Sequence, residues 1–349
     1  MGCPVTEPLG VAILGCAHTA HAWSYARALT SSPTSRLLGV FDEVPELAAP
    51  LAREFGAPQF TDSASLVERA GVEAVVVCSA TVQHRRLVEL AAGHGLHVLC
   101  EKPIATRLED ARAIVDVCAR SSVQLQMAFV TRFLPLVQQV RSAIVAGDLG
   151  DLLAMVAGNR GRPPLPPQYP SWITTKTESG GGALIDHSVH LTDVMRHLTG
   201  REVVRVAAEV DSRLWDCGVD DVALLSLVFG DGPVASVDPS WSVPAGNPWD
   251  YDFYLRVVGT RGSLSITDLA ESVRLVSASA GGGLRLVPFG VDVDAAMVEA
   301  FVASIRAGEV LGPCATGDDG LRALEIALAG YAAADRAETV SLPLELPEG

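Results

Sequence analysis

The chain has 349 residues, of which 49% are apolar and 19% charged, a composition typical of globular rather than disordered proteins. It carries 41 acidic and 26 basic side chains, a formal net charge of −15. Such a surface repels the phosphates of nucleic acids and of anionic lipids, so we expect neither nucleic acid nor a membrane as a partner. The length exceeds that of one typical domain, so two domains are expected.

Cysteine usage and the N-terminal sequence bear on the cellular compartment. The seven cysteines are odd in number and contain no C-x-x-C pair, which argues against a disulfide framework and a thiolate zinc site. A signal peptide requires a basic n-region, but no Lys or Arg precedes Arg27. No apolar stretch approaches the roughly 20 residues of a membrane helix. These features predict a cytoplasmic protein.

The first 130 residues alternate short apolar runs with helical segments. Strands are predicted at 9–16, 35–42, 73–80, 97–103 and 124–130, and the clearest helices at 20–30 and 45–55. Nearly continuous apolar runs are typical of parallel strands buried on both faces and connected by crossover helices. Residues 1–130 are therefore predicted to form a doubly wound α/β domain of the Rossmann type.

The pattern changes after residue 130. Helices are predicted at 134–146, 181–198, 293–307 and 317–336, and strands at 151–158, 201–210, 222–229, 234–241, 251–258 and 338–344, with shorter strands up to 289. The proline-rich segment 161–171 is expected to run extended. The turn sequence at 230–233, Gly-Asp-Gly-Pro, predicts a hairpin between two of the strands. Residues 131–349 are thus predicted to form an α+β domain around an antiparallel sheet.

The first strand leads into the sequence GCAHTA at residues 15–20, which has the spacing of the dinucleotide fingerprint G-x-G-x-x-G/A. An ordinary strand-to-helix turn is the alternative interpretation, because Ala17 adds a methyl group where a pyrophosphate would approach. Asp42 ends the second strand, where a carboxylate accepts hydrogen bonds from the adenine ribose and repels a 2′-phosphate. Together these features predict NAD, in preference to NADP. The predicted cofactor contacts here are Gly15, Ala17, His18, Thr19, Ala20 and Asp42.

Lys102 follows a predicted parallel strand, at the end that faces the ligand crevice of such sheets. A lysine there can neutralise negative charge that develops on a substrate oxygen, although a solvated lysine is the simpler interpretation.

The segment SGGGALIDHSVHLTD, residues 179–193, combines three glycines with a predicted helix. The glycines are expected to let the backbone approach a ligand closely. Asp186 and His190 lie four residues apart on one helix face, as in a general acid/base held by a carboxylate. The alternative is an Asp stabilised by the helix dipole and a His of the core. His187 and His197 are expected to face elsewhere and to be structural. A metal site at 186, 187 and 190 lacks an obvious further ligand, and none is predicted.

The motifs GCAHTA, FD, CSATVQH (78–84), CEKP and GGGALIDHSVH, in that order, resemble the glucose–fructose oxidoreductase / inositol dehydrogenase / rhizopine-catabolism family of NAD(P)-dependent oxidoreductases. Segments 257–264 and 312–333 resemble later motifs of that family, so the likeness covers nearly the whole chain. It implies a Rossmann domain followed by an open-faced sheet domain, with substrate between them. It further implies a catalytic set of Lys102, Asp186 and His190, and cofactor contacts from Ser79, His84, Glu101, Lys102 and Trp172.

Three positions depart from the family pattern. Ala17 replaces the second glycine of the fingerprint, Cys78-Ser79-Ala80 replaces Cys-Thr-Pro, and His187-Ser188 replaces Ile-Gly. The first is expected to weaken or tilt the grip on the pyrophosphate, and the third to alter a wall of the substrate pocket. None removes a predicted catalytic group.

The predicted function is a reversible dehydrogenase acting on a secondary alcohol or ketone of a sugar, amino sugar or cyclitol. His190 would take the hydroxyl proton, Asp186 would orient His190, and Lys102 would stabilise the alkoxide. Substrate contacts are expected from Arg132, Trp249 and Tyr251. Two alternatives remain: an NAD-dependent glycosidase or eliminase that oxidises the sugar only transiently, and a non-catalytic regulator that senses the dinucleotide.

The strand at 222–229 is apolar on both faces. A sheet that helices cover on one side only should be polar on the other. We therefore expect the open sheet to be covered by a second copy of the chain, in a homodimer or homotetramer. The alternative is a strand that is buried on both faces within one subunit.

Overall fold

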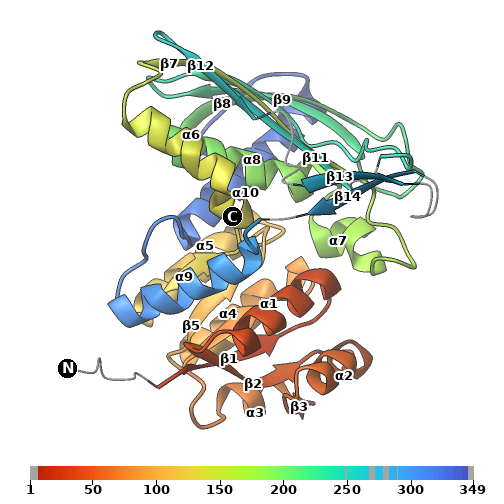
Figure 1. The fold of residues 1–349 in the computed structure, drawn as a ribbon, viewed down its shortest axis with the longest axis vertical. Helices are drawn as coiled ribbons and strands as arrows, with labels where there is room; N and C mark the ends of the chain where they lie inside the picture. Colours follow the sequence, from red (N-terminus) through yellow and green to blue (C-terminus); the bar gives the residue numbers. More distant parts are fainter. Residues whose placement is uncertain (1–6, 248–249, 267–271, 278–282, 289, 345–349) are drawn as a thin grey trace. The chain divides into compact units, whose positions relative to one another are not determined.

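A computed structural model describes residues 7–247, 250–266, 272–277, 283–288 and 290–344 (Figure 1). The chain divides into two compact units that are discontinuous in sequence. The first comprises Met1–Phe133, Leu165–Gly180 and Val293–Leu324, and the second Leu134–Pro164, Gly181–Asp292 and Glu325–Gly349. The first break lies close to the domain boundary expected at 130/131, but two later segments return to the first unit.

Within the described residues the first unit contains a seven-stranded sheet of order β15-β6-β5-β4-β1-β2-β3. Its strands are β1 (Leu9–Leu14), β2 (Ser35–Phe41), β3 (Gln59–Phe60), β4 (Ala74–Val77), β5 (His97–Cys100), β6 (Leu125–Met127) and β15 (Ala315–Thr316). All neighbours pair in parallel except β15, which runs antiparallel to β6. Every residue of β1 and β4 is buried, as their uninterrupted apolar sequences predict.

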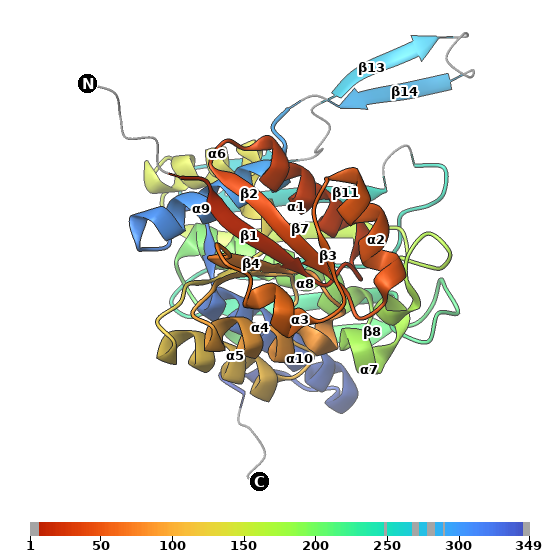
Figure 2. The same cartoon turned by 90° about the horizontal axis from the view of Figure 1, so that it is seen from below.

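Two groups of helices flank this sheet (Figure 2). One group is α1 (Thr19–Ser31), α2 (Pro45–Glu54) and α9 (Val293–Ala307), and the other is α3 (Ser63–Val67), α4 (His84–Gly93) and α5 (Leu108–Arg120). Side chains of α9, among them Phe301, share one core with those of β1 and α1. The predicted doubly wound Rossmann architecture is confirmed, with α9 and β15 as additions from late in the chain.

The sheet of the second unit has the order β12-β11-β7-β10-β9-β8-β16 in the part of the chain that the structure describes. Its strands are β7 (Leu152–Gly161), β8 (Val203–Asp211), β9 (Val222–Phe229), β10 (Val234–Asp238), β11 (Tyr251–Gly259), β12 (Ser263–Ile266) and β16 (Val340–Ser341). Only the β7–β10 pair is parallel among the pairs described. The predicted hairpin joins β9 to β10, and Asp231 in its turn has φ = 49°. The expectation of a mainly antiparallel sheet is confirmed.

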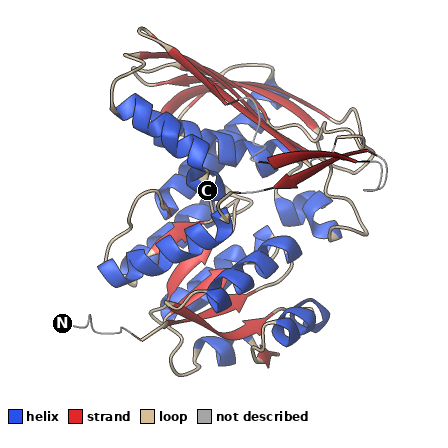
Figure 3. Cartoon of the chain, viewed as in Figure 1, coloured by secondary structure: helices blue, strands red, loops and turns tan. Residues whose placement is uncertain are grey.

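Helices α6 (Pro135–Val145) and α8 (Ala183–Thr199), labelled in Figure 1, lie on one face of this second sheet, as the same view in Figure 3 shows. Among the described residues, no helix of this unit covers the other face. Helix α10 (Gly317–Arg336) contains the last boundary between the two units, and β13 (Ser272–Ser277) pairs with β14 (Gly283–Pro288) in a separate hairpin. No helix in the described ranges has the length and apolarity to span a bilayer.

Several short elements were not predicted. They include the two-residue strand β3, helix α7 (Lys176–Ser179), and the 3-10 turns η1 (Thr81–Gln83), η2 (Val130–Phe133) and η3 (Ser171–Thr174). The expectation of an extended segment at 161–171 is only partly correct, because residues 166–168 form a turn. Elements of two to four residues are too short to carry a hydrophobic period, which explains why the sequence did not reveal them.

Candidate functional site

The fingerprint loop of the first unit requires a glycine at its first position. Gly15 has φ = +92°, in the left-handed region, and its amide donates to the Phe41 carbonyl at 2.7 Å. A Cβ atom at position 15 would lie 2.5 Å from the backbone of Ser79, in the loop after β4. Gly15 thus allows the loops that follow β1 and β4 to touch at the carboxyl edge of the sheet.

Helix α1 offers its N-terminus to a ligand at the end of this loop. No side chain caps the helix, and its first turn, residues 19–22, is described in full and holds no acidic residue. Thr19 and Ala20 are exposed, and Ala17 is half-buried. A helix N-terminus with this character favours an anionic group, so the loop fits the pyrophosphate of a dinucleotide.

Asp42 is buried at the end of β2, and the fingerprint loop holds its carboxylate. The Cys16 amide donates to Oδ2 at 2.6 Å, and the Val44 amide donates to Oδ1 at 2.8 Å. A carboxylate has about four acceptor sites. It can therefore organise this backbone and still accept hydrogen bonds from ribose hydroxyls.

Glu101, at the end of β5, anchors α1 to the strand end that carries Lys102. Its Oε1 accepts a hydrogen bond from Tyr25 and lies 2.7 Å from Nδ1 of His21, while the Lys102 amide donates to Oε2 at 3.0 Å. Burial raises the pKa of Glu101. The charge and hydrogen bond of His21, together with the charges of His18 and Lys102, lower it by more than burial raises it, so the net pKa is lowered. For His21, burial lowers the pKa, but the charge and hydrogen bond of Glu101, together with the charge of Asp294, outweigh burial, so the net pKa is raised.

His21 and Tyr25 were not among the predicted site residues. They lie one turn apart on α1, and the His18 ring stacks on His21 at a centroid distance of 3.8 Å. The spacing of His18, His21 and Tyr25 places all three on one face of a helix, a signal that was present in the sequence. The cluster joins the fingerprint loop to the Glu101–Lys102 pair.

His84 and Ser79 connect the loops after β4 and β5. The His84 ring is 1% exposed, with Nδ1 3.0 Å from the Pro103 carbonyl and Nε2 3.3 Å from the Ser79 carbonyl. Burial lowers the pKa of His84. These contacts are with backbone atoms, so they indicate that His84 shapes the strand ends that a cofactor would meet. Lys102 itself is buried at the end of β5.

Trp172 contacts the fingerprint loop from the returning segment 165–180. Its indole Nε1 donates to the Ala17 carbonyl at 3.1 Å, and its ring lies 6.2 Å from the His18 ring, edge to face. Both contacts lie within the first unit, where η3 and α7 pack together. Trp172, predicted as a cofactor contact from the family resemblance, therefore lies beside the second fingerprint position.

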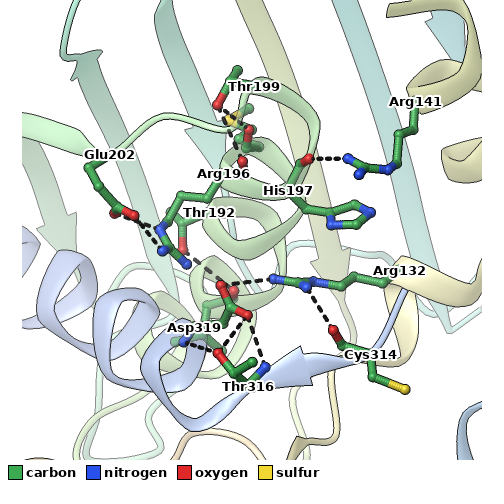
Figure 4. A network of polar contacts seen from close by, with 12 residues as sticks. Arg132, Arg141, Thr192, Arg196, His197, Thr199, Glu202, Cys314, Thr316 and Asp319 are labelled. Carbon is green, nitrogen blue, oxygen red and sulfur yellow. Dashed lines mark hydrogen bonds and ion pairs between the residues drawn. The ribbon is translucent and has the colours of Figure 1, made fainter. Parts of the chain in front are cut away.

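Arg132 has structural partners in the first unit, which argues against the predicted substrate contact. Its side chain is 5% exposed, and Nη2 forms an ion pair with Asp319 at 3.2 Å (Figure 4). Its Nη1 donates to the Cys314 carbonyl at 3.2 Å. This buried guanidinium, with its two partners, connects η2 to the segment around β15.

In the second unit, the glycine run makes room for protein groups. A Cβ at Gly181 would lie 2.1 Å from the Tyr331 hydroxyl oxygen, and one at Gly182 would lie 2.0 Å from the Asp220 carbonyl oxygen. Gly180, which belongs to the first unit, has φ = +91° and ends α7. The expectation that these glycines serve ligand approach is not supported, because each has a steric or conformational reason of its own.

Asp220 fixes the start of α8. Its carboxylate accepts hydrogen bonds from the amides of Gly182 and Leu184, each at 2.8 Å, and from the Tyr331 hydroxyl at 2.8 Å. Burial, and then the charge of Asp220, raise the pKa of Tyr331 well above its usual value. Neither residue was predicted. By accepting hydrogen bonds from these first amides, the Asp220 carboxylate caps α8 and determines where the helix begins. It thereby also determines where Asp186 and His190 lie in the first two turns.

The Asp186 carboxylate is held at Oδ2. Trp241 Nε1 donates to this oxygen at 3.2 Å, and His187 Nε2 lies 3.2 Å from it. The expectation that His187 faces away from Asp186 is therefore wrong. His190 is 7% exposed and lies one turn further along the same helix.

Of the other predicted substrate residues, Tyr251 is 52% exposed at the start of β11, with its ring 5.9 Å from His187. It therefore offers a partly open aromatic surface next to the Asp186–His187 pair. Trp249 lies outside the described residues.

The far end of α8 is secured within the second unit. Arg196 donates to Glu202 through Nε and Nη2 at 2.8 and 2.6 Å, and Arg141 donates to the His197 carbonyl at 2.8 Å (Figure 4). With Asp220 at its start, α8 is thus anchored at both ends.

Two family models match the chain in succession. Residues 9–129 match the oxidoreductase family with an NAD-binding Rossmann fold, and residues 137–265 match the GFO/IDH/MocA C-terminal domain. An inositol 2-dehydrogenase of Rhizobium meliloti is 30% identical over 316 residues, which cover 87% of this chain and 90% of that protein. The chain belongs to the GFO/IDH/MocA oxidoreductase family. The family resemblance seen in the sequence motifs is confirmed.

Two further proteins resemble this chain, one in sequence and one in fold. A 2,7-anhydro-N-acetylneuraminate hydratase of Escherichia coli is 28% identical over 252 residues, covering 71% of this chain and 64% of that protein. A structure of levoglucosan dehydrogenase in complex with NADH and levoglucosan has a TM-score of 0.82 at 24% identity, covering 97% of this chain and 100% of that one. This likeness establishes a shared fold, and the first unit is an NAD-binding Rossmann domain.

Proposed function

We propose that this oxidoreductase is an NAD-dependent dehydrogenase that acts reversibly on a secondary alcohol of a sugar, amino sugar or cyclitol. The observation that carries the proposal is the placement of Asp186 and His190 one turn apart on α8. Asp220 holds the start of this helix, and the Asp186 carboxylate has two neighbours, Trp241 and His187. The R. meliloti relative, named an inositol 2-dehydrogenase, supports a polyol substrate.

In this proposal each side chain has a distinct part. His190 takes the proton of the substrate hydroxyl, Asp186 orients His190 and stabilises its protonated form, and Lys102 stabilises negative charge on the substrate oxygen. When bound, the nicotinamide supplies an acceptor for the hydride. General base help is worth roughly 10²–10⁴-fold and an oriented charge about 10²–10³-fold in rate. Glu101, held by Tyr25 and His21, positions the backbone at Lys102.

A substrate screen tests the proposed function. Purified protein is incubated with NAD and with sugars, amino sugars, sugar phosphates or inositols, and NADH formation is followed by absorbance. The reverse reaction is tested with keto sugars and NADH. We expect stoichiometric NADH formation with at least one polyol, and formation that is slower by roughly 10²–10⁴-fold with the His190→Asn variant. A screen without turnover in either direction would contradict the proposal.

A redox-neutral reaction is the second candidate, and the hydratase relative is the observation that favours it. Such an enzyme would oxidise its substrate only transiently and return the hydride before product leaves. It would convert substrate to product with no net change in NADH, whereas a dehydrogenase gives one NADH for each product. The presence of Lys102, Asp186 and His190 together argues against a non-catalytic regulator.

Asp42 is expected to give a preference for NAD(H) over NADP(H). A carboxylate opposite a 2′-phosphate costs on the order of 1–2 kcal/mol, so NAD(H) should bind at least about tenfold more tightly. Fluorescence titration with both cofactors measures the ratio, and Asp42→Asn should reduce it. The melting temperature of the variant serves as a control, since Asp42 also holds the Cys16 and Val44 amides. Equal affinities of the wild type for NAD(H) and NADP(H) would contradict the expected contact between Asp42 and the adenine ribose.

The open face of the second sheet is expected to form a homodimer or homotetramer interface. Leu224, Val156 and Val234 are 53%, 43% and 54% exposed on three adjacent strands, and the strand register places them on the same face. Exposed apolar side chains gathered in this way mark an association surface. Light scattering at micromolar concentration should give a multiple of the chain mass.

Leu224→Asp should shift this protein toward the monomer, because it places a charge on the apolar face. Leu214→Asp is the matched control, since Leu214 is also 53% exposed but lies outside the sheet strands. A wild-type protein that is monomeric at this concentration would rule the interface out.

A further inference from the structure

We propose that His187 is a positioning residue that holds the Asp186 carboxylate through its Nε2–H group. The inference rests on the proposed function, in which Asp186 orients His190. His187 is also one of the positions at which this chain departs from the family pattern, so the contact is a feature of this chain's own sequence.

The contact has a defined chemical direction. His187 Nε2 lies 3.2 Å from Asp186 Oδ2, and Trp241 Nε1 donates to the same oxygen at 3.2 Å. An ionised carboxylate only accepts hydrogen bonds, so a neutral His187 ring that donates to it would carry its proton on Nε2. The two donors come from different elements: His187 from α8 and Trp241 from the chain after β10. The Trp241 hydrogen bond and the His187 contact converge on one oxygen, and both neighbours restrict rotation of a side chain that is 22% exposed.

The surroundings of His187 keep the ring in place. The residue is 4% exposed, and a Cβ at Gly161 would lie 2.6 Å from its Cε1 atom, so the glycine at the end of β7 makes room for the ring. The Tyr251 ring lies 5.9 Å away. Burial and these neighbours leave the His187 ring little room to turn away from Asp186. That confinement is what a residue needs in order to position another group.

Two substitutions separate positioning from packing. His187→Gln keeps an N–H donor near the position of Nε2, whereas His187→Leu fills the space without a donor. We expect His187→Leu to lower kcat for alcohol oxidation by about tenfold or more, with the Kd for NAD(H) unchanged, because a misplaced catalytic geometry costs rate. His187→Gln should retain kcat within about threefold of the wild type. His197→Leu, ten residues further along α8, controls for general disturbance of the helix.

Two kinetic outcomes would overturn the inference. The first is a folded His187→Leu protein with wild-type kcat. The second is a folded His187→Gln protein that has lost as much activity as His187→Leu. The N–H donor that Gln retains would then make no difference, and the role of His187 would be packing.

Histidine NMR gives a readout that does not depend on turnover. In protein labelled with nitrogen-15 at histidine, neutral His187 should carry its proton on Nε2, and Asp186→Asn should shift that resonance. A ring protonated on Nδ1 would overturn the inference even in an inactive protein. If the protein has no dehydrogenase activity but shows the expected Nε2–H signal, the proposed function is contradicted and the contact between His187 and Asp186 is not.

Discussion

Replacing His190 with Asn is expected to lower kcat for alcohol oxidation by roughly 10²–10⁴-fold, since the amide has a similar size but does not accept a proton at neutral pH. Because His190 is proposed to act on the substrate hydroxyl, the Kd for NAD(H) should remain close to that of the wild type. Steady-state kinetics with the substrate found in the screen measure the first quantity, and cofactor titration the second.

The pH–rate profile provides an independent check on His190. Oxidation by the wild type should fall toward acid, because a protonated imidazole does not accept the hydroxyl proton. His190→Asn should lose this acidic limb. If Asp186 and His190 only stabilise α8, the variant will show a lower melting temperature but normal turnover while folded. Wild-type turnover in folded His190→Asn would therefore end the proposed catalytic role, whatever the family relationship.

The second large effect is expected from Lys102→Met, which keeps the length of the side chain and removes its charge. Loss of an electrostatic partner for the developing alkoxide should lower kcat by about 10²-fold or more. The chain has only one other lysine, Lys176, which is exposed on α7, so Lys176→Met is the matched control and should behave as the wild type.

The double variant of Lys102 and His190 tests whether both groups serve one transition state. Two groups that act together do not contribute independently, so the double variant should lose less rate than the product of the single losses. Rate losses that multiply in full would indicate that the two residues act in separate steps. Melting temperatures of all three variants verify that each is measured in its folded form.

The strands and helices near the start of the chain could be predicted well from sequence. The apolar runs at β1, β4 and β5 predicted parallel strands correctly, because a strand that is buried on both faces has an uninterrupted apolar sequence. The spacing of Asp186 and His190 likewise predicted that both lie on one helix, because a helical period is a local property.

Long-range contacts could not be predicted in this way. Segments 165–180 and 293–324 join the first unit, although their sequences resemble those of any other loop or amphipathic helix. Arg132 was expected at the substrate and instead pairs with Asp319, which is far away in sequence. An amphipathic helix or a buried arginine requires some partner, but its own residues do not specify which one.

The sequence by itself thus determined the Rossmann architecture, the fingerprint loop and the helix that carries Asp186 and His190. Only the tertiary structure decided why the glycine run exists and what holds Asp186. Gly181 and Gly182 make room for Tyr331 and Asp220, and Trp241, 55 residues away, donates to the Asp186 carboxylate. Hydrophobic periodicity reports which face of an element is buried. The partner that covers this face is set by the packing of elements distant in sequence, which no local pattern encodes.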